Sequence, residues 1–415
     1  MGFVISLAIK NLFRYRRRTI ITALAIAAGV AMFIFMDGWL KGAEKDSIRN
    51  LVKFETGSAR VMDNTYWEEH DYLLPKYYIK DPAPIMEKLQ AAGYTVAPRV
   101  TILATVSKVG GEKDSYTLQL AGIDPALDPK IFDLANAITP KEGSYLKAGE
   151  QAILLGEDVA ARLGVGFNDA VSINTRTKDG VWTGMEARVT GILSTPDPIV
   201  NNSMGFVPLD VMQDMLQMGT GVTDIVIGFP EWIDPDKETA KINTLLGKQT
   251  YSAKSFNDLA AEFGMIAQTK SGGSKVIIFL IFIIAAIGIS NTILMAVYER
   301  VREIGMMRAL GMKDRSILLG FVFEALGIGL LGAVLGVCMG VIINLYMVNV
   351  GIDLSPFIKD MGNIGYRIAG VSKSTWNVDS ILTVGILSVL FSGVFAVLPA
   401  MRALKKEITD CLRIK

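Results

Sequence analysis

The chain has 415 residues, with 42 lysines and arginines against 41 acidic residues, one histidine and two cysteines. A mean hydropathy of +0.37 and a 51% share of apolar residues are too high for a water-soluble chain of this size. So few cysteines and histidines exclude a disulfide scaffold and a zinc ribbon, and a net charge of +1 excludes a nucleic-acid binder with a global basic excess.

The first predicted elements are a basic helix and an apolar span. Apolar side chains recur near helical spacing beside a basic cluster, which favours an interfacial helix over residues 1–18, with a disordered basic tail as the alternative. Thr19–Met36 is 18 residues without a charge, so residues 19–40 are predicted to cross a membrane. The run is long for a signal-peptide core and no small-residue cleavage site follows, so we expect an uncleaved anchor.

Residues 41–275 alternate short strand-like runs with amphipathic helices, which indicates an α+β domain. Interruptions rich in Pro, Gly and Asn at 124–150 and 194–205 predict two lobes, one inserted in the other. Glu157–Leu163 is predicted to be a helix that Gly164 stops. The other expected helices lie within Tyr78–Ala92 and at Leu209–Gln217, and the expected strands are Thr95–Val109, Tyr116–Gly122, Ala152–Leu155, Val171–Ile173, Ala187–Leu193 and Thr223–Gly228.

This domain carries little catalytic or metal-binding chemistry. His70 lies in an acidic segment that could bind a cation, but a solvated turn is the simpler interpretation. Asp234 and Asp236 lack the remaining ligands of a calcium loop. The segment closest to a phosphate-binding loop, Gly247-Lys248, has neither the upstream glycine nor the following Ser or Thr. We therefore expect no catalytic residue, metal or cofactor in this chain, and expect another chain to supply energy for any work across the membrane.

Three further apolar runs follow the external domain, at Val276–Tyr298, Ile317–Ile352 and Ser380–Met401. They predict spans over 276–298, 316–350 and 380–401, with a loop at 299–315, an external loop at 351–379 and a tail at 402–415. The fold class is thus four transmembrane helices in a 1+3 arrangement with a large α+β extracytoplasmic domain.

Charge asymmetry predicts the orientation of these spans. The two terminal flanks and the 299–315 loop together hold 15 basic and 5 acidic residues, whereas residues 41–275 hold 24 basic and 31 acidic residues. Basic residues accumulate on the cytoplasmic side of short membrane flanks. Both termini and the 299–315 loop are therefore expected in the cytoplasm, and residues 41–275 outside.

The 299–315 loop contains the most informative pattern. Ile304, Met307, Leu310 and Gly311 form an apolar stripe on a predicted short helix, beside acidic and basic residues spaced one turn apart. Such a helix suits docking into a groove on a soluble partner. A solvated loop with ordinary membrane-flank arginines is the alternative.

The span over 316–350 carries small residues and one acid. Gly329, Gly332, Gly336 and Gly340 would let another helix approach closely, either within the subunit or at a dimer seam. Glu324 is costly in a bilayer, by on the order of 2.5–3.5 kcal/mol at its centre, so we expect it to reach the interface or to pair with an arginine. The uncharged cores of the other spans offer no second ionisable group, which argues against an ion-coupled pump and against a polar substrate pathway.

Several segments resemble the FtsX/MacB-like permeases of ABC transporters. The resemblance lies in residues 11–24, 299–311, 324–327 and 399–403, in the glycine row, and in Leu155–Gly164, which is similar to the family's periplasmic core. These segments extend over essentially the whole chain, and they follow one another in the same order as in the family. The resemblance implies a periplasmic domain of MacB core type and a location in the inner membrane.

The resemblance implies a permease of the mechanotransmission type. Such a permease pairs with a second permease subunit, the same or homologous, and with two copies of an ATPase chain that binds ATP and Mg. ATP-driven closure would move the spans and, through stalks at 41–55 and 255–275, the external lobes. The residues implied to couple to the ATPase are Glu299, Arg300, Arg302, Glu303, Ile304, Gly305, Met307, Arg308, Ala309, Leu310 and Gly311.

Within the superfamily, the chain is most similar to the lipoprotein-releasing LolC/LolE permeases. That similarity implies release of lipid-anchored proteins from the inner membrane to a periplasmic carrier, with membrane lipids as neighbours of the substrate. Two other functions stay open: an FtsX-like envelope scaffold that controls wall hydrolases, and MacB-like export of hydrophobic compounds.

Overall fold

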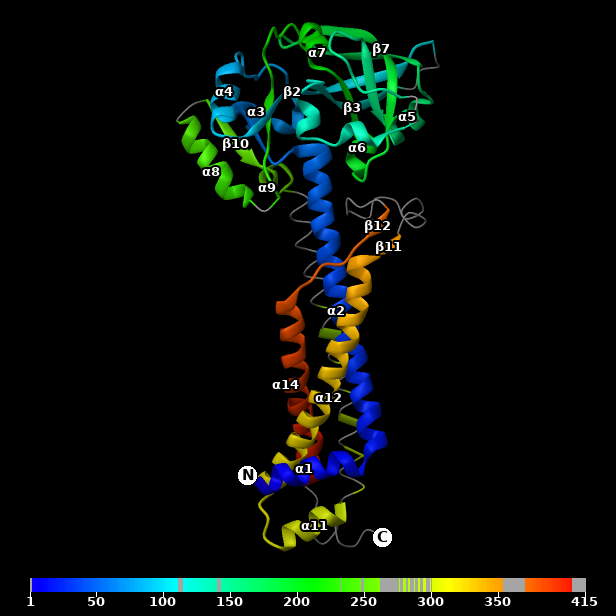
Figure 1. The fold of residues 1–415 in the computed structure, drawn as a ribbon, viewed down its shortest axis with the longest axis vertical. Helices are drawn as coiled ribbons and strands as arrows, with labels where there is room; N and C mark the ends of the chain where they lie inside the picture. Colours follow the sequence, from blue (N-terminus) through cyan, green and yellow to red (C-terminus); the bar gives the residue numbers. More distant parts are fainter. Residues whose placement is uncertain are drawn as a thin grey trace. The chain divides into compact units, whose positions relative to one another are not determined.

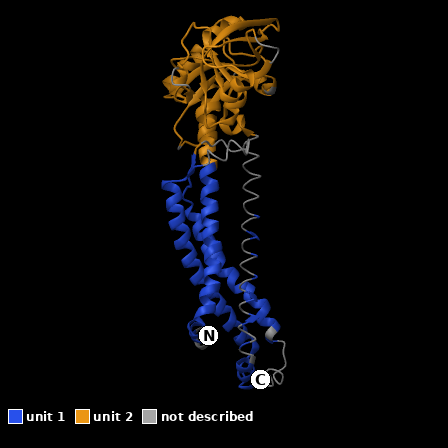
Figure 2. Cartoon of the chain, turned by 90° about the vertical axis from the view of Figure 1, so that its right-hand side faces the viewer, with its two compact units in different colours: residues 1–43, 267–353, 371–415 blue, residues 44–266, 354–370 orange. Residues whose placement is uncertain are grey.

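A computed structural model describes residues 2–110, 115–139, 143–231, 233–247, 250–261, 301–353 and 370–404, with scattered positions between 276 and 299. The chain forms two compact units, coloured blue and orange in Figure 2. The helical unit comprises residues 1–43, 267–353 and 371–415, and the sheet unit comprises residues 44–266 and 354–370. Most of the expected span at 276–298, part of the expected loop at 351–379 and the tail beyond residue 404 lie outside the described residues.

Within its described residues, the helical unit contains long apolar helices and two short ones (Figure 1). Among the described residues, α2, α12 and α14 are long and apolar enough to cross a membrane. A helix, α1, is present at the N-terminus, and only Tyr15 lies between its last residue and the first residue of α2. The location of α1 at a membrane interface stays a prediction. The bounds are α1 Gly2–Arg14, α2 Arg16–Leu51, α11 Val301–Ala309, α12 Asp314–Asn349 and α14 Val378–Leu404.

The glycine row of α12 packs against neighbouring helices of the same chain. A Cβ atom on Gly336 would lie 2.7 Å from Cβ of Val30 in α2, and one on Gly332 would lie 2.7 Å from Cβ of Ile26. Gly340 faces Ile34 in the same way. Gly329 turns instead toward Ser392 of α14. These glycines therefore pack within the subunit in this structure, where they let the helix backbones approach closely.

The sheet unit is built on ten strands in the order β10-β1-β9-β2-β3-β8-β5-β7-β4, with β6 pairing with both β2 and β7. Its strands are β1 Ala59–Asp63, β2 Thr95–Lys108, β3 Ser115–Ile123, β4 Ile138–Thr139, β5 Ala152–Gly156, β6 Ala170–Arg176, β7 Trp182–Leu193, β8 Met204–Pro208, β9 Asp224–Gly228 and β10 Tyr251–Ser255.

Short helices connect these strands and cover the sheet (Figure 1). They are η1 Val52–Thr56, α3 Asn64–Glu68, η2 His70–Tyr72, α4 Ala83–Ala91, η3 Asp128–Lys130, η4 Leu134–Ala137, α5 Glu157–Leu163, α6 Pro198–Ser203, α7 Leu209–Leu216, α8 Pro235–Leu246 and α9 Phe256–Leu259. A further short pair, β11 Ile352–Asp353 with β12 Val371–Ser372, is antiparallel and belongs to the helical unit.

All of the strands and helices predicted for the external domain are present. Helix α5 buries Val159, Ala160 and Leu163 and ends at Gly164, which has a left-handed backbone with φ of 60°. The sequence patterns did not reveal β1, β10 or α8, and the supposed interruption at 194–205 contains α6 and the start of β8. Strands β1 and β10 are short and partly polar, and they are extended because they pair with each other. The division into two lobes stays a prediction.

Candidate functional site

The short helix α11 and the turn after it are tied to the start of α12. Gly311 has a left-handed backbone with φ of 87°. Its N–H donates to the carbonyl of Arg308 at 3.0 Å, which caps the last turn of α11. The Arg308 guanidinium then forms an ion pair with Asp314 in the first turn of α12, with Nε and Oδ1 3.0 Å apart. Helix α11 is therefore joined to α12 by a short, closed turn.

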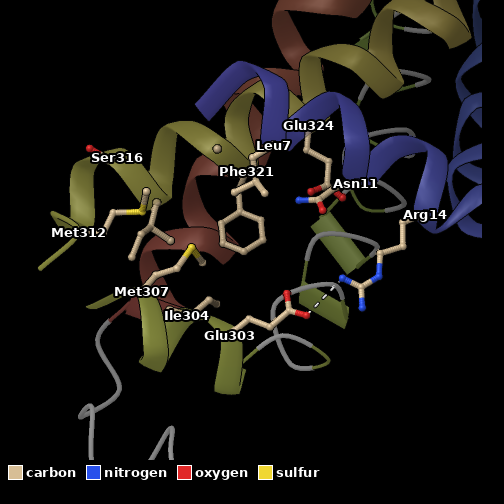
Figure 3. Close-up of a pocket in the computed structure, with 12 residues that line it drawn as sticks. Leu7, Asn11, Arg14, Glu303, Ile304, Met307, Met312, Ser316, Phe321 and Glu324 are labelled. Atoms are coloured by element: carbon tan, nitrogen blue, oxygen red, sulfur yellow. Dashed lines mark hydrogen bonds and ion pairs between the residues drawn. The ribbon is translucent and has the colours of Figure 1, made fainter. Parts of the chain in front are cut away.

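One side of α11 packs into the core of the helical unit. Ile304 is buried in a cluster with Ile317 and Phe321 of α12, and Met307 packs against the same cluster. A cavity of about 160 Å³ lies beside them, lined by residues of α1, α11 and α12 (Figure 3). Gly305 is also buried. This inner side holds α11 in place.

The opposite side of α11 is exposed. Met306 is 47% exposed and Leu310 is 88% exposed. With Arg302 and Ala309, which are also exposed, they follow helical spacing. The predicted apolar stripe is thus divided between the two sides: Ile304 and Met307 face the protein's own core, and Leu310 faces outward. The sequence pattern could not separate them, because both sides of α11 carry apolar residues.

Arginines near the junction of α1 and α2 form ion pairs with acidic residues of this region. Arg14 Nη1 lies 3.4 Å from Glu303 Oε1 (Figure 3). Arg18 Nη1 lies 3.4 Å from Glu299 Oε2, and Arg18 Nη2 lies 3.1 Å from Glu324 Oε1. The expectation that Glu324 pairs with an arginine is confirmed, and its side chain is only 2% exposed. Arg300, the remaining charged residue of the predicted coupling set, lies outside the described residues.

The contacts of His70 and Asp234, the other candidate residues of the sequence, are with neighbouring residues of the fold. His70 stacks on Trp67 with ring centroids 4.5 Å apart, and its Nδ1 lies 2.6 Å from the Trp67 carbonyl oxygen. Asp234 accepts hydrogen bonds from the backbone of Asp236 and Lys237 and so caps α8. Within the described part of the chain, no group of three or more His, Cys, Asp or Glu side chains is placed to hold a metal ion.

Comparison with known families agrees with this architecture. Residues 19–245, more than half of the chain, match the MacB-like periplasmic core domain. Residues 275–408 match the FtsX-like permease C-terminal domain. The chain belongs to the FtsX/MacB-like permease family. The sheet unit of this permease is accordingly a periplasmic core domain of the MacB type, with an α+β fold.

The relatives of this FtsX/MacB-like permease are distant. Over 81% of its length it is 21% identical to the macrolide export ATP-binding/permease protein MacB of Pasteurella multocida, of which it spans about half, 51%. Over 94% of its length it is 22% identical to the lipoprotein-releasing system transmembrane protein LolC of Xylella fastidiosa, of which it spans 92%. Over 32% of its length it is 33% identical to the ABC transporter permease YtrF of Bacillus subtilis, of which it spans 29%.

These findings place the permease in a broad functional class. It is an ABC transporter permease subunit of the MacB/LolC type, in a family of inner-membrane proteins that carry a periplasmic domain.

Proposed function

We propose that this permease is driven by a separate ATPase chain that docks on the outward side of α11. The supporting observation is that α11 is pinned on its inner side by Ile304 and presents Met306 and Leu310 to solvent. An exposed apolar pair on a short, anchored helix is a suitable ridge for a groove on a soluble protein. ATP and Mg would be bound by the ATPase chain.

The same proposal specifies the organisation of the complex. Four spans at 19–40, 276–298, 316–350 and 380–401 are arranged 1+3, and both termini and the 299–315 loop face the cytoplasm. The interfacial helix is residues 1–18 and the periplasmic domain is residues 41–275. The external loop is residues 351–379 and the cytoplasmic tail is residues 402–415. Two ATPase copies serve this chain and a second permease subunit, which is the same or homologous. The basic flanks beside the spans support this orientation.

The substrate that we propose is a lipid-anchored protein, released from the inner membrane to a periplasmic carrier. The support is the similarity to the lipoprotein-releasing LolC of Xylella fastidiosa, which extends over nearly the full length of both chains. The similarity to MacB proteins supports export of a hydrophobic compound as the second candidate. In either case the substrate is handled outside the membrane or taken from its outer leaflet, among membrane lipids.

Replacement of Leu310 by aspartate tests the docking surface. We expect the Leu310→Asp variant to lose about tenfold or more of the ATPase chain that co-purifies with the permease, because an exposed apolar contact becomes a desolvated charge. Phe167→Asp, an exposed apolar position of the sheet unit, is the matched control and should retain the ATPase. Full retention in Leu310→Asp would refute the docking surface. Gly305 and Arg308 are poorer test positions, because their replacement disturbs α11 itself.

Depletion of the permease tests the substrate. Pulse-labelled lipoproteins that accumulate in the inner membrane would support lipoprotein release. Normal lipoprotein traffic with higher sensitivity to hydrophobic compounds would support export instead. Unseparated cells with normal lipoproteins would point to a scaffold that controls wall hydrolases and would contradict both transport functions.

A further inference from the structure

The cavity between α1, α11 and the start of α12 has one charged end and one uncharged end (Figure 3). The phenyl ring of Phe321 lies between the two ends. Met312 and Ser316 lie at the uncharged end. The charged and amide side chains gather at the other end, and they are Asn11, Arg14, Glu303 and Glu324. A ligand that suits this cavity is therefore small and carries charge.

The volume of the cavity limits its occupant to a small group. The cavity measures about 160 Å³. An apolar cavity of about 150 Å³ holds one benzene molecule. The cavity thus has room for a headgroup of several heavy atoms, but not for a nucleotide or a whole phospholipid.

The charged end has an ion pair that a ligand can separate. Glu303 and Arg14 are 43% and 63% exposed, and the atoms that pair are 3.4 Å apart. An exposed pair of this kind contributes little to stability. Glu324 differs, because its side chain is 2% exposed and is held by Arg18, which does not line the cavity. Ligand binding at this end therefore replaces the contact between Glu303 and Arg14 and leaves Glu324 in place.

A ligand that separates Glu303 from Arg14 must satisfy both charges. A primary ammonium offers three N–H donors to a carboxylate, and a phosphate accepts paired bonds from a guanidinium. A headgroup with both groups exchanges one long ion pair for two charge-assisted contacts. A quaternary ammonium has no N–H to donate, and a headgroup with phosphate alone would place a further negative charge beside two carboxylates.

The exposed residues of α1 indicate where such a headgroup comes from. Ile9 is 50% exposed and Phe13 is 66% exposed, and they lie one helical turn apart. Lys10 between them is also exposed. Apolar and basic side chains on the surface of one helix are typical of helices that lie among phospholipid headgroups. This surface supports a phospholipid, rather than a soluble metabolite, as the occupant of the adjoining cavity.

We propose that the cavity binds the headgroup of a phospholipid that carries a primary amine, phosphatidylethanolamine. Its ammonium donates to Glu303, with the negative charge of Glu324 nearby, and its phosphate accepts from Arg14. The glycerol and the acyl chains lie outside the cavity. The bound headgroup joins α1 to α11, and it is a resident lipid rather than the transported substrate. The inference goes beyond the proposed function and does not use the docking of an ATPase.

Lipid retention by the full-length permease in detergent tests the headgroup. The protein is equilibrated with equal amounts of phosphatidylethanolamine, phosphatidylcholine and phosphatidylglycerol that have the same acyl chains, and native mass spectrometry counts the bound lipids. We expect phosphatidylethanolamine to be retained about fivefold or more over each of the others. Equal retention of the three lipids, or a preference for phosphatidylglycerol, would overturn the proposal.

Two variants test the site by different means. Glu303→Gln removes the acceptor of the ammonium, and Ser316→Phe fills the uncharged end while every charge stays in place. Both should reduce the retained phosphatidylethanolamine by about fivefold or more. Asp379→Asn is the control, because Asp379 is an exposed carboxylate of α14 outside the cavity, and it should retain the lipid like the wild type. A wild-type preference in either cavity variant would show that the lipid binds elsewhere.

Soluble phosphoethanolamine separates the lipid from a free metabolite of the same chemistry. We expect a millimolar concentration to leave the bound lipid in place, because the soluble compound has no acyl chains. Displacement at a micromolar concentration would assign the cavity to the free zwitterion and overturn the lipid assignment. All of these measurements are made without nucleotide. Retention of the ATPase by Leu310→Asp would refute the docking proposal and leave them unchanged.

Discussion

At the scale of single residues, the stability of the sheet unit depends on a buried ion pair. In the sheet unit, Arg99 of β2 donates from Nε to Oδ1 of Asp128 at 2.9 Å, and both side chains are fully buried. Tyr145 donates its hydroxyl to the other Asp128 oxygen at 3.2 Å, and the Phe132 ring covers the guanidinium at 3.6 Å. Each of the two charges compensates the other. An isolated buried charge would be strongly destabilising.

Removal of this carboxylate charge should be costly. We expect Asp128→Asn to lower the free energy of unfolding of the sheet unit by about 3–5 kcal/mol, because the Arg99 charge stays buried without its counter-ion. Pulse proteolysis in urea on the full-length protein measures the change. The exposed pair of Lys237 and Asp234 is the control, and Lys237→Ala should leave the urea midpoint unchanged. A midpoint for Asp128→Asn equal to that of the wild type would contradict the role of the pair.

The sequence does not reveal this pair. Asp128 stands in a Pro-rich connection, Arg99 follows a proline within a strand pattern, and their separation carries no periodic signal. Glu324 is the opposite case: a lone acid in an apolar run must find a partner, so its pairing with an arginine was predictable although the identity of that arginine was not.

At the scale of elements, α5 and α11 show when a pattern suffices. In α5, Val159, Ala160 and Leu163 lie on one side and a glycine marks the end, so the buried face and the stop of this helix are predictable. In α11, apolar residues occupy both sides, and the packing of α1 and α12 decides which side is free. The glycines of α12 are likewise ambiguous in sequence, and contacts with α2 and α14 give each its partner.

A small enlargement of the glycine row should disturb α2 and α12. We expect Gly336→Ala to lower the stability of the helical unit by about 1–3 kcal/mol, because the added methyl group would overlap Val30 and the Ala27 backbone. Thermal unfolding in detergent measures the loss. Gly385→Ala in α14 is the matched control, since its new Cβ would meet only Val337 at 3.7 Å, an ordinary contact. Equal midpoints for the two variants would show that the α2–α12 contact is loose.

At the scale of the whole molecule, the orientation of the spans in the membrane decides whether α11 faces the cytoplasm, where an ATPase could bind it. In a background without Cys338 and Cys411, we expect Leu310→Cys to react with a membrane-impermeant maleimide only after the inner membrane is opened. Trp182→Cys, an exposed position on the periplasmic core, should react in intact spheroplasts. The reverse labelling pattern would place α11 outside the cell and would remove the proposed ATPase site.

The sequence by itself determined the family, the long apolar helices and most strands of the external domain, because these depend on run length, local periodicity and short motifs. Only the tertiary structure decided which arginine neutralises Glu324, which helices the glycines face and which side of α11 is free. Those outcomes depend on contacts between residues tens to hundreds of positions apart. A local pattern records that a residue needs a partner, but the partner's position is known only when the chain is folded.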